Sequence, residues 1–214
     1  MKVKWLGHAC FVITSASGAR IITDPYEPVN GINYKPLNES ADVVTVSHEH
    51  FDHSNARAVK GNPQVLKGPG VRDIKGVRFN GVAAYHDENQ GKQRGPVTVF
   101  CFNPDGINVC HLGDLGQKLS PEQIAEIGKV DVLLAPVGGF YTVDAKAANE
   151  ICGQLHPRVV IPMHYKTDRI GLPINTADEF VQLRPNVRTL DASEVEFRAD
   201  SLPSNETILL KHAM

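Results

Sequence analysis

The chain has 214 residues, of which 42% are hydrophobic, and a formal net charge of −2. One domain over residues 1–214 is the default at this length, and such a domain can bury roughly 70% of its unfolded surface without disulfide staples. The near-neutral charge gives no electrostatic footprint for nucleic acid, and no segment approaches the ~18 consecutive apolar residues of a membrane span, so neither partner is expected.

The first half of the chain consists of short strand signals separated by Gly, Pro and Asn turns. The apolar runs predict a meander and then further strands, over residues 2–6, 10–14, 19–23, 43–46, 77–85 and 97–102. A hairpin turn at Asn103-Pro104-Asp105-Gly106 leads to a return strand over 107–112. The long segment from Tyr26 to Ser40 has no clear structure, and such loops are often functional.

The second half alternates helix and strand. Ser120 is an N-cap followed by Pro121 at the first helical position, which predicts a helix to about Ile127. In both halves a hairpin ends in an aspartate, Asp24 or Asp114, and another strand follows. This repeat favours two packed sheets with helices outside, which is an α/β fold. The remaining expected elements are helices over 144–155 and 176–183 and strands over 130–135, 158–162, 187–190 and 206–210.

The four cysteines are spread through the chain with no CxxC pair. Free cysteine in an apolar strand behaves as a small hydrophobe. The start of the chain, MKVKWLGHACFVITS, is typical of a first strand rather than of a signal peptide. We therefore expect buried, reduced thiols in a cytoplasmic protein and no cysteine metal site, for Cys10, Cys101, Cys110 and Cys152.

The stretch VVTVSHEHFDH ends a buried strand in three histidines and an aspartate. If strand geometry continues past the apolar run, His48 and His50 lie on one side of it. Asp52 and His53 then fall in the turn before a further expected helix. Imidazole and carboxylate are the ligands of zinc and related divalent ions. The alternative is a polar loop that happens to be rich in histidine.

Other candidate ligands stand where other strands are expected to end. His86 follows GVAAY, Asp114 follows INVCHLG, and His164 follows RVVIPM. Strand ends that meet at one edge of a rigid scaffold commonly supply the residues of an active site. The sequence therefore predicts a metal site that collects these residues with the histidine-rich stretch.

These motifs resemble the signatures of the metallo-β-lactamase fold superfamily. VSHEHFDH resembles its HxHxDH signature, IITDPY its first aspartate motif, AYHD its third-motif histidine, HLGDLG its bridging aspartate motif and IPMHY its last histidine motif. The motifs occur in the family's order from Asp24 to His164. WLGHACF and HLGD look most like the branch that contains ascorbate-6-phosphate lactonases and many zinc-dependent hydrolases.

The resemblance implies a four-layer αββα sandwich, with two mixed β-sheets and helices outside, and two divalent metal ions. Zinc is the expected metal, and manganese or iron bind similar sites. Position 50 is histidine, whereas the flavo-diiron oxygen reductases of the superfamily resemble HxExDH there, which favours hydrolysis over a redox role. The ligands implied are His48, His50 and His86 for one ion and Asp52, His53 and His164 for the other, with Asp114 bridging the two.

Three further residues are candidates for a supporting role. Asp24 would hydrogen-bond a metal ligand or the strand-end backbone, or act only as a turn carboxylate. His8 could reach the mouth of the metal site as a substrate contact, or pack beneath the sheet. His111 fits either a hydrogen-bond donor to a ligand or a core histidine.

Two divalent ions that share a water lower its pKa toward neutrality. The resulting hydroxide would attack a carbonyl carbon or a phosphorus while the metals stabilise the developing charge. Asp52 or Asp114 would hold or receive the proton of the water, and His8 could assist the leaving group. The expected activity is a metal-dependent hydrolase acting on a small metabolite, either phosphorylated or carrying a lactone or ester.

The loops near the expected site carry cations and aromatic side chains. Cations beside two metals could clamp a phosphate or carboxylate, and the alternative is a solvated loop. The cations are Lys92, Arg94, Lys166 and Arg169. The aromatic residues, which would line the pocket or pack in the core, are Tyr26, Tyr34, Phe140 and Tyr141.

Two other functions fit the same motifs. A phosphodiesterase or nuclease uses this chemistry on the same fold, but it would need a basic patch or a substrate-binding arm, and neither is visible. A non-catalytic metal-binding module is the other, and the complete ligand set argues against a vestigial site. A homo-oligomer is compatible with the sequence.

Overall fold

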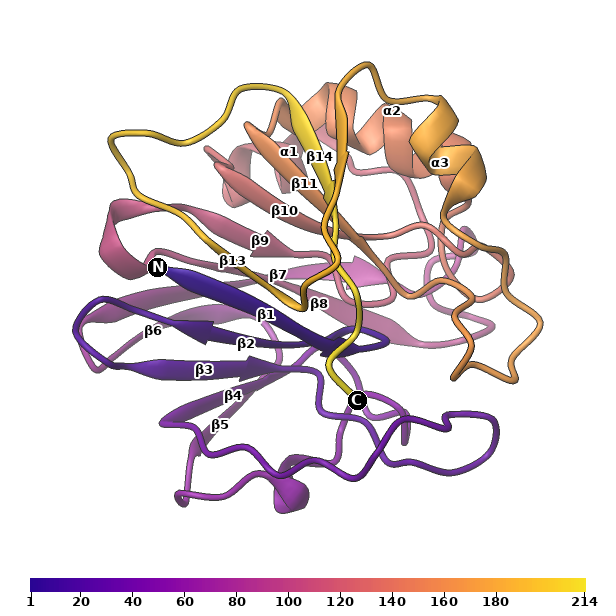
Figure 1. Ribbon diagram of the computed structural model, residues 1–214. Helices are drawn as coiled ribbons and strands as arrows, with labels where there is room; N and C mark the ends of the chain where they lie inside the picture. Colours follow the sequence, from indigo (N-terminus) through magenta and orange to yellow (C-terminus); the bar gives the residue numbers. More distant parts are fainter.

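Two mixed β-sheets pack face to face (Figure 1). The computed structural model describes residues 1–214. The strands of the first sheet are β1 (Lys2–Gly7), β2 (Cys10–Thr14), β3 (Arg20–Thr23), β4 (Val43–Val46), β5 (Gln64–Lys67) and β13 (Glu194–Glu196). Those of the second are β6 (Gly70–Ile74), β7 (Val77–Tyr85), β8 (Pro96–Phe102), β9 (Val109–His111), β10 (Val132–Pro136), β11 (Val159–Met163), β12 (Val187–Thr189) and β14 (Glu206–Leu209).

The strand order in each sheet confirms the repeat seen in the sequence. The six-stranded order is β13-β1-β2-β3-β4-β5, and the eight-stranded order is β12-β14-β11-β10-β9-β8-β7-β6. In the first sheet β2 and β3 are antiparallel and β4 runs parallel to β3. In the second, β8 and β9 are antiparallel and β10 runs parallel to β9. Equivalent strands of the two sheets therefore end at equivalent positions, and polar residues follow them there: Asp24 after β3 and Asp114 after β9.

Both faces of the six-stranded sheet are buried at its central strands β2, β3 and β4. In β2, Phe11 and Ile13 belong to the large core between the sheets, whereas Cys10 and Val12 belong to a second cluster on the outer face. This alternation follows from the period of two along a strand. It explains why these strands have nearly continuous apolar sequences.

The segment between Tyr26 and Ser40 covers that outer face. Tyr26, Ile32, Tyr34 and Leu37 pack there against the apolar side chains of β2, β3 and β4. The hydroxyl group of Tyr26 donates to the carbonyl oxygen of Lys35, which fixes the loop on itself. The segment without predicted structure thus serves as a packing layer. The helix expected just after the histidine-rich turn is only a short 3-10 turn, Ala56–Ala58.

Three helices lie beyond the eight-stranded sheet, on the side away from the first sheet (Figure 1). They are α1 (Pro121–Ile127), α2 (Ala145–Leu155) and α3 (Asp178–Gln182). Ser120 caps α1 through a capping box with Gln123, as its sequence predicts. The α/β sandwich of two mixed sheets is confirmed, with few helices. The third helix is shorter than expected, and Ala177 rather than a polar residue precedes it.

Two simpler features complete the fold. None of the four cysteines forms a disulfide, and Cys10, Cys110 and Cys152 are buried. The helices are all too short or too polar to cross a membrane.

Candidate metal centre

The predicted ligands come from strand ends in both sheets. The turn after β4 supplies four of them, and the ends of β7, β9 and β11 supply the rest. Parallel and equivalent strands bring these ends to one edge of the sandwich. The side chains that meet there are His48, His50, Asp52 and His53 from the first sheet and His86, Asp114 and His164 from the second.

His48, His50 and His86 form the first group. One nitrogen of each lies within 4.8 Å of the others, and Nε2 of His48 is 3.1 Å from Nδ1 of His50. The strand β4 ends at Val46, so the loop, rather than a continuing strand, makes the two histidines converge. His48 and His86 are buried and His50 is exposed, so this group faces solvent on one side.

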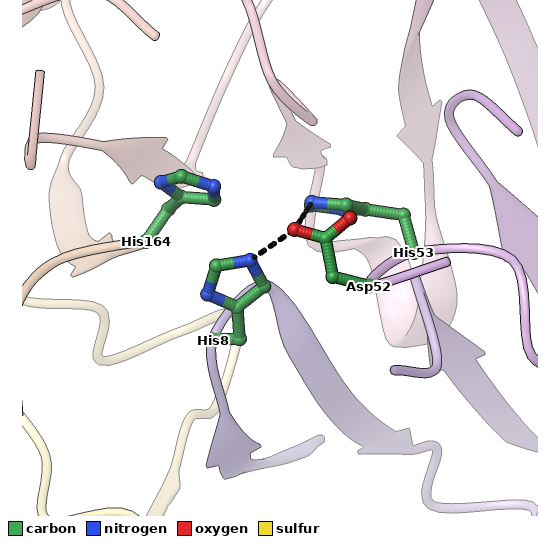
Figure 2. A group of neighbouring side chains, drawn as sticks. All are labelled: His8, Asp52, His53 and His164. Carbon is green, nitrogen blue, oxygen red and sulfur yellow. Dashed lines mark hydrogen bonds and ion pairs between the residues drawn. The ribbon is translucent and has the colours of Figure 1, made fainter. Parts of the chain in front are cut away.

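Asp52, His53 and His164 form the second group, together with His8 (Figure 2). Figure 2 shows the Asp52 carboxylate between the rings of His8 and His53. Nε2 of His8 lies 3.1 Å from Oδ2 of Asp52, and His8 is fully buried. His8 therefore supports Asp52 from a buried position, which agrees with the second of the two readings that the sequence left open, a packed histidine.

Asp114 lies between the two groups. Its Oδ2 is 3.3 Å from Nε2 of His86 and 3.2 Å from Nε2 of His164. Its Oδ1 is 3.2 Å from Nε2 of His53. One carboxylate thus reaches histidines of both groups, which is the bridging position that the resemblance implies.

Asp24 fixes the orientation of two histidines. Its Oδ1 accepts the backbone N–H of Ser47, and its Oδ2 accepts the Ser47 hydroxyl and lies 2.9 Å from Nδ1 of His53. The Ser47 hydroxyl is also 3.0 Å from Nδ1 of His48. Both rings therefore use Nδ1 for these hydrogen bonds and direct Nε2 toward other candidate ligands, His50 for His48 and Asp114 for His53. Sequence reasoning missed Ser47, whose only signal is its place before the first histidine.

His111 braces the backbone instead of a ligand. Its Nε2 lies 2.9 Å from the carbonyl oxygen of Ala9, and its Nδ1 accepts the backbone N–H of Gly113. Gly113 directly precedes Asp114, so His111 fixes the loop that carries the bridging carboxylate. Of the two readings that the sequence left open, the core histidine is the one that the structure shows.

Asp87 organises the loop after His86, and sequence reasoning missed it. Its carboxylate accepts four backbone N–H groups, at distances of 2.8 to 3.1 Å. Asp in a turn typically accepts nearby backbone N–H groups in this way, so its place before a Glu-Asn-Gln-Gly sequence was the available signal. The donors are Asn89, Gly91, Gln93 and Arg94.

The charges at the site suit cation binding. Burial alone would raise the pKa of the Asp114 carboxyl, but His164 and His53 hold that pKa well below its usual value. Burial would likewise raise the pKa of Asp52, and His53 and His8 outweigh it so that the pKa is lowered. Burial lowers the pKa of His48 to about 3, and the neighbouring His53 adds to this effect. Burial would lower the pKa of His53, but Asp114 and Asp52 raise it well above its usual value. Ionised carboxylates and neutral imidazoles are the forms that bind metal, so a cation would displace the His53 proton.

The residues fit the binding of divalent cations. Nε2 of His53 and Oδ1 of Asp114 are buried and 3.2 Å apart, but no hydrogen bond of acceptable geometry joins them to each other or to another protein atom. A buried polar group left without a partner costs about 1–3 kcal/mol. A cation between them would supply the missing interaction, and the imidazole and carboxylate donor set is that of zinc, manganese or iron sites.

Two adjoining cavities open beside the centre. The larger has a volume of about 500 Å³. Its lining includes three candidate ligands, His50, Asp52 and Asp114, and the apolar or aromatic residues Phe51, Tyr141 and Leu172. The second, of about 360 Å³, shares four residues with it: His86, Gln93, Arg94 and Tyr141. Of the aromatic candidates, Tyr141 and Phe140 line these cavities. Tyr26 and Tyr34 are instead buried beneath the first sheet.

Comparisons with known proteins agree with this geometry. The family model described as a β-lactamase superfamily domain matches residues 2–164. A UPF0173 metal-dependent hydrolase from Methanoculleus marisnigri is 32% identical over 191 residues, which are 78% of this chain and 82% of that protein. A crystal structure from Thermotoga maritima, described as a candidate Zn-dependent hydrolase of the metallo-β-lactamase superfamily, is 38% identical with a TM-score of 0.82 over 98% of each chain. A metallo hydrolase from Ignicoccus hospitalis shares the fold at 24% identity and a TM-score of 0.64, over 92% of this chain and 99% of that one.

Proposed function

This chain belongs to the metallo-β-lactamase superfamily, and on that premise we propose that it is a metal-dependent hydrolase with two divalent cations at its centre. The proposed substrate is a small molecule with an ester, lactone or phosphoester bond. The observation that carries this proposal is Asp114, whose two oxygens reach histidines of both ligand groups.

The proposal assigns the ligands by their groups. His48, His50 and His86 would hold one cation, and Asp52, His53 and His164 the other. When bound, two such cations would lower the pKa of a water and stabilise negative charge on the substrate. We prefer zinc as the metal because a relative of this chain, from Thermotoga maritima, is described as a candidate Zn-dependent hydrolase.

The chain's own residues would orient the reactants and accept the proton. Asp52 lines the larger cavity, and its Oδ2 is held by His8. Its Oδ1 makes no hydrogen bond within the protein, so it is available to a water in the cavity. The lowered pKa of Asp52 keeps the carboxylate ionised, so it can accept a hydrogen bond from this water, and it also makes the carboxylate a weak base for the proton that the water loses.

The cavity favours a small substrate over a nucleic acid. A volume of about 500 Å³ is within the range of small-molecule sites. Glu49, Asp52 and Asp114 face it, and the protein carries a net charge of −2. A nucleic-acid site would instead need a basic surface. We therefore retain the small-molecule hydrolase as the proposed function.

The test joins metal content to turnover. Protein purified without chelator is assayed for zinc, manganese and iron, and then with p-nitrophenyl butyrate, a lactone panel and bis-p-nitrophenyl phosphate. We expect two equivalents of metal, and turnover that falls to background in Asp114→Ala. Protein that neither retains metal nor turns over any of these compounds after reloading would refute the proposal.

A further inference from the structure

The cations near the site differ in their partners. Lys118 lines the smaller cavity but pairs with Glu150. Lys166 donates from Nζ to the carbonyl oxygen of Leu172, and Arg169 pairs with Asp168. Lys92 is exposed and does not line the cavities that contain His86. The guanidinium group of Arg94, by contrast, makes no hydrogen bond or ion pair with the protein and lies in the wall of both cavities. Arg94 is therefore the cation that is free to bind a ligand there.

Arg94 is also held in position. Its backbone N–H donates to Asp87, which gathers the whole loop around one carboxylate. Its guanidinium carbon lies 5.5 Å from the centre of the Tyr141 ring, so the group is stacked on an aromatic face. The residue is half-buried. A cation fixed at both its backbone and its head group loses little entropy when it binds an anion.

The acidic residues around the smaller cavity do not neutralise Arg94. The Asp87 carboxylate is taken up by backbone N–H groups, and Asp144 accepts the backbone N–H of Ala147 at the start of α2. Glu88 also lines this cavity but forms no ion pair with Arg94. The guanidinium therefore keeps its donors available on the side of the metal centre, where His86 is a shared lining residue.

We propose that Arg94, stacked on Tyr141, binds an anionic oxygen group of the substrate, a carboxylate or a phosphate, while the bond to be cleaved lies over the metal centre. Guanidinium presents paired N–H donors that match either group. The ligand's identity as a substrate rests on the proposed function, but anion binding at Arg94 does not. The proposal narrows the substrate class to small anionic molecules.

The test measures binding first. Zinc-loaded wild type, Arg94→Gln, Arg94→Lys and Lys92→Gln are titrated calorimetrically with glutarate and with inorganic phosphate, after their zinc content is shown to be equal. Lys92→Gln is the matched control, because it removes one positive charge from the same loop outside the cavities. We expect Arg94→Gln to weaken binding of at least one anion roughly 10- to 100-fold, as for a charge-assisted paired hydrogen bond. Arg94→Lys should be intermediate and Lys92→Gln within twofold of wild type.

Comparing the two anions distinguishes the two classes of anionic substrate. A larger loss for glutarate assigns a carboxylate substrate, and a larger loss for phosphate assigns a phosphorylated one. Equal weakening in Arg94→Gln and Lys92→Gln, or no weakening in either, would overturn the proposal. Hydrolysis of p-nitrophenyl butyrate, a neutral ester, should be unchanged in Lys92→Gln, which lies outside both cavities. If no variant hydrolyses any ester and Arg94 still controls anion binding, the hydrolase proposal fails while the anion site stands.

Discussion

At the scale of single residues, Asp24 is the side chain on which two candidate ligand histidines, His48 and His53, depend. It is fully buried, and its carboxylate accepts from Ser47 and lies within hydrogen-bond distance of His53. Removing it would free the His53 ring and, through Ser47, the His48 ring. It would also leave buried donors without an acceptor.

We therefore expect Asp24→Ala to lose both metal affinity and stability. Loss of a carboxylate behind a ligand histidine lowers metal affinity about 10- to 100-fold. Each buried donor left unpaired costs about 1–3 kcal/mol of the free energy of unfolding. Competition titration with a zinc indicator measures the first effect, and urea unfolding of the metal-free protein measures the second.

Asp131→Ala is the control for Asp24→Ala. Asp131 is also a buried carboxylate, and it accepts the backbone and side-chain N–H groups of Asn108 at the start of β10, the end away from the metal centre. Its loss should destabilise the protein and leave zinc affinity unchanged. Equal zinc affinities in both variants would show that Asp24 is only a turn carboxylate.

Residue types were easier to predict than residue orientations. The sequence identified His8 as a candidate, but not that it lies beneath Asp52. That placement depends on long-range contacts: Nε2 of His8 lies 3.1 Å from Oδ2 of Asp52, and the carbonyl oxygen of His8 accepts the backbone N–H of His164. The backbone of His8 is left-handed, with φ of 54°. A motif of seven residues carries none of this information.

At the scale of elements, two glycines allow the loops to pack against the ligands. A Cβ atom on Gly116 would lie 2.3 Å from the backbone carbon of His86, and one on Gly138 would lie 2.3 Å from the carbonyl oxygen of His164. Real Cβ atoms do not approach backbone this closely. Each of these candidate ligand histidines is therefore fixed by the close approach of a neighbouring loop.

Gly116→Ala should accordingly displace His86. Overpacking of a well-packed site costs about 1–3 kcal/mol, and a shifted His86 should weaken zinc binding in its group. Gly153→Ala is the matched control, because Gly153 lies in α2 with nothing within 4 Å of its added Cβ, and it should stabilise the protein by about 0.4–1 kcal/mol. Chemical unfolding and zinc titration of both variants measure these effects. A Gly116→Ala protein as stable and as tight for zinc as wild type would contradict this account.

Elements with an apolar period were predicted, and those without one were missed. The strands β2, β4, β7 and β11 have clear apolar runs and were found close to their observed bounds. The strand β6 is almost wholly exposed at the edge of its sheet, so its sequence shows no buried face. The outer cover of the first sheet is a loop, because scattered apolar residues such as Ile32 and Leu37 pack there without any helical period.

At the scale of the whole molecule, the candidate metal centre lies where the two sheets meet. One set of ligand candidates follows β4 of the first sheet, and the other set follows β7, β9 and β11 of the second. The order of the motifs along the chain made this convergence predictable, because equivalent strands end at the same edge. The protonation states of the buried histidines and aspartates were not predictable from the sequence. They depend on distances of about 3 Å between side chains that are far apart in sequence.

A centre that joins two sheets should couple metal binding to folding, and the size of this coupling counts the ions. Metal that binds the native state alone stabilises it by about 1.4 kcal/mol for each tenfold rise in free zinc and for each bound ion. Two ions therefore predict a slope of about 2.8 kcal/mol per tenfold rise in free zinc for wild type, measured by urea unfolding in zinc buffers.

His50→Ala removes one ligand of one group at an exposed position, so the protein should still fold and the slope should fall to about 1.4 kcal/mol. Since the two chains share every other histidine, zinc binding to their unfolded states is nearly the same, and the difference between the slopes reports the lost ion. A wild-type slope already near 1.4 kcal/mol would mean that a single cation occupies the centre, and that Asp114 holds its place between the groups without bridging two metals.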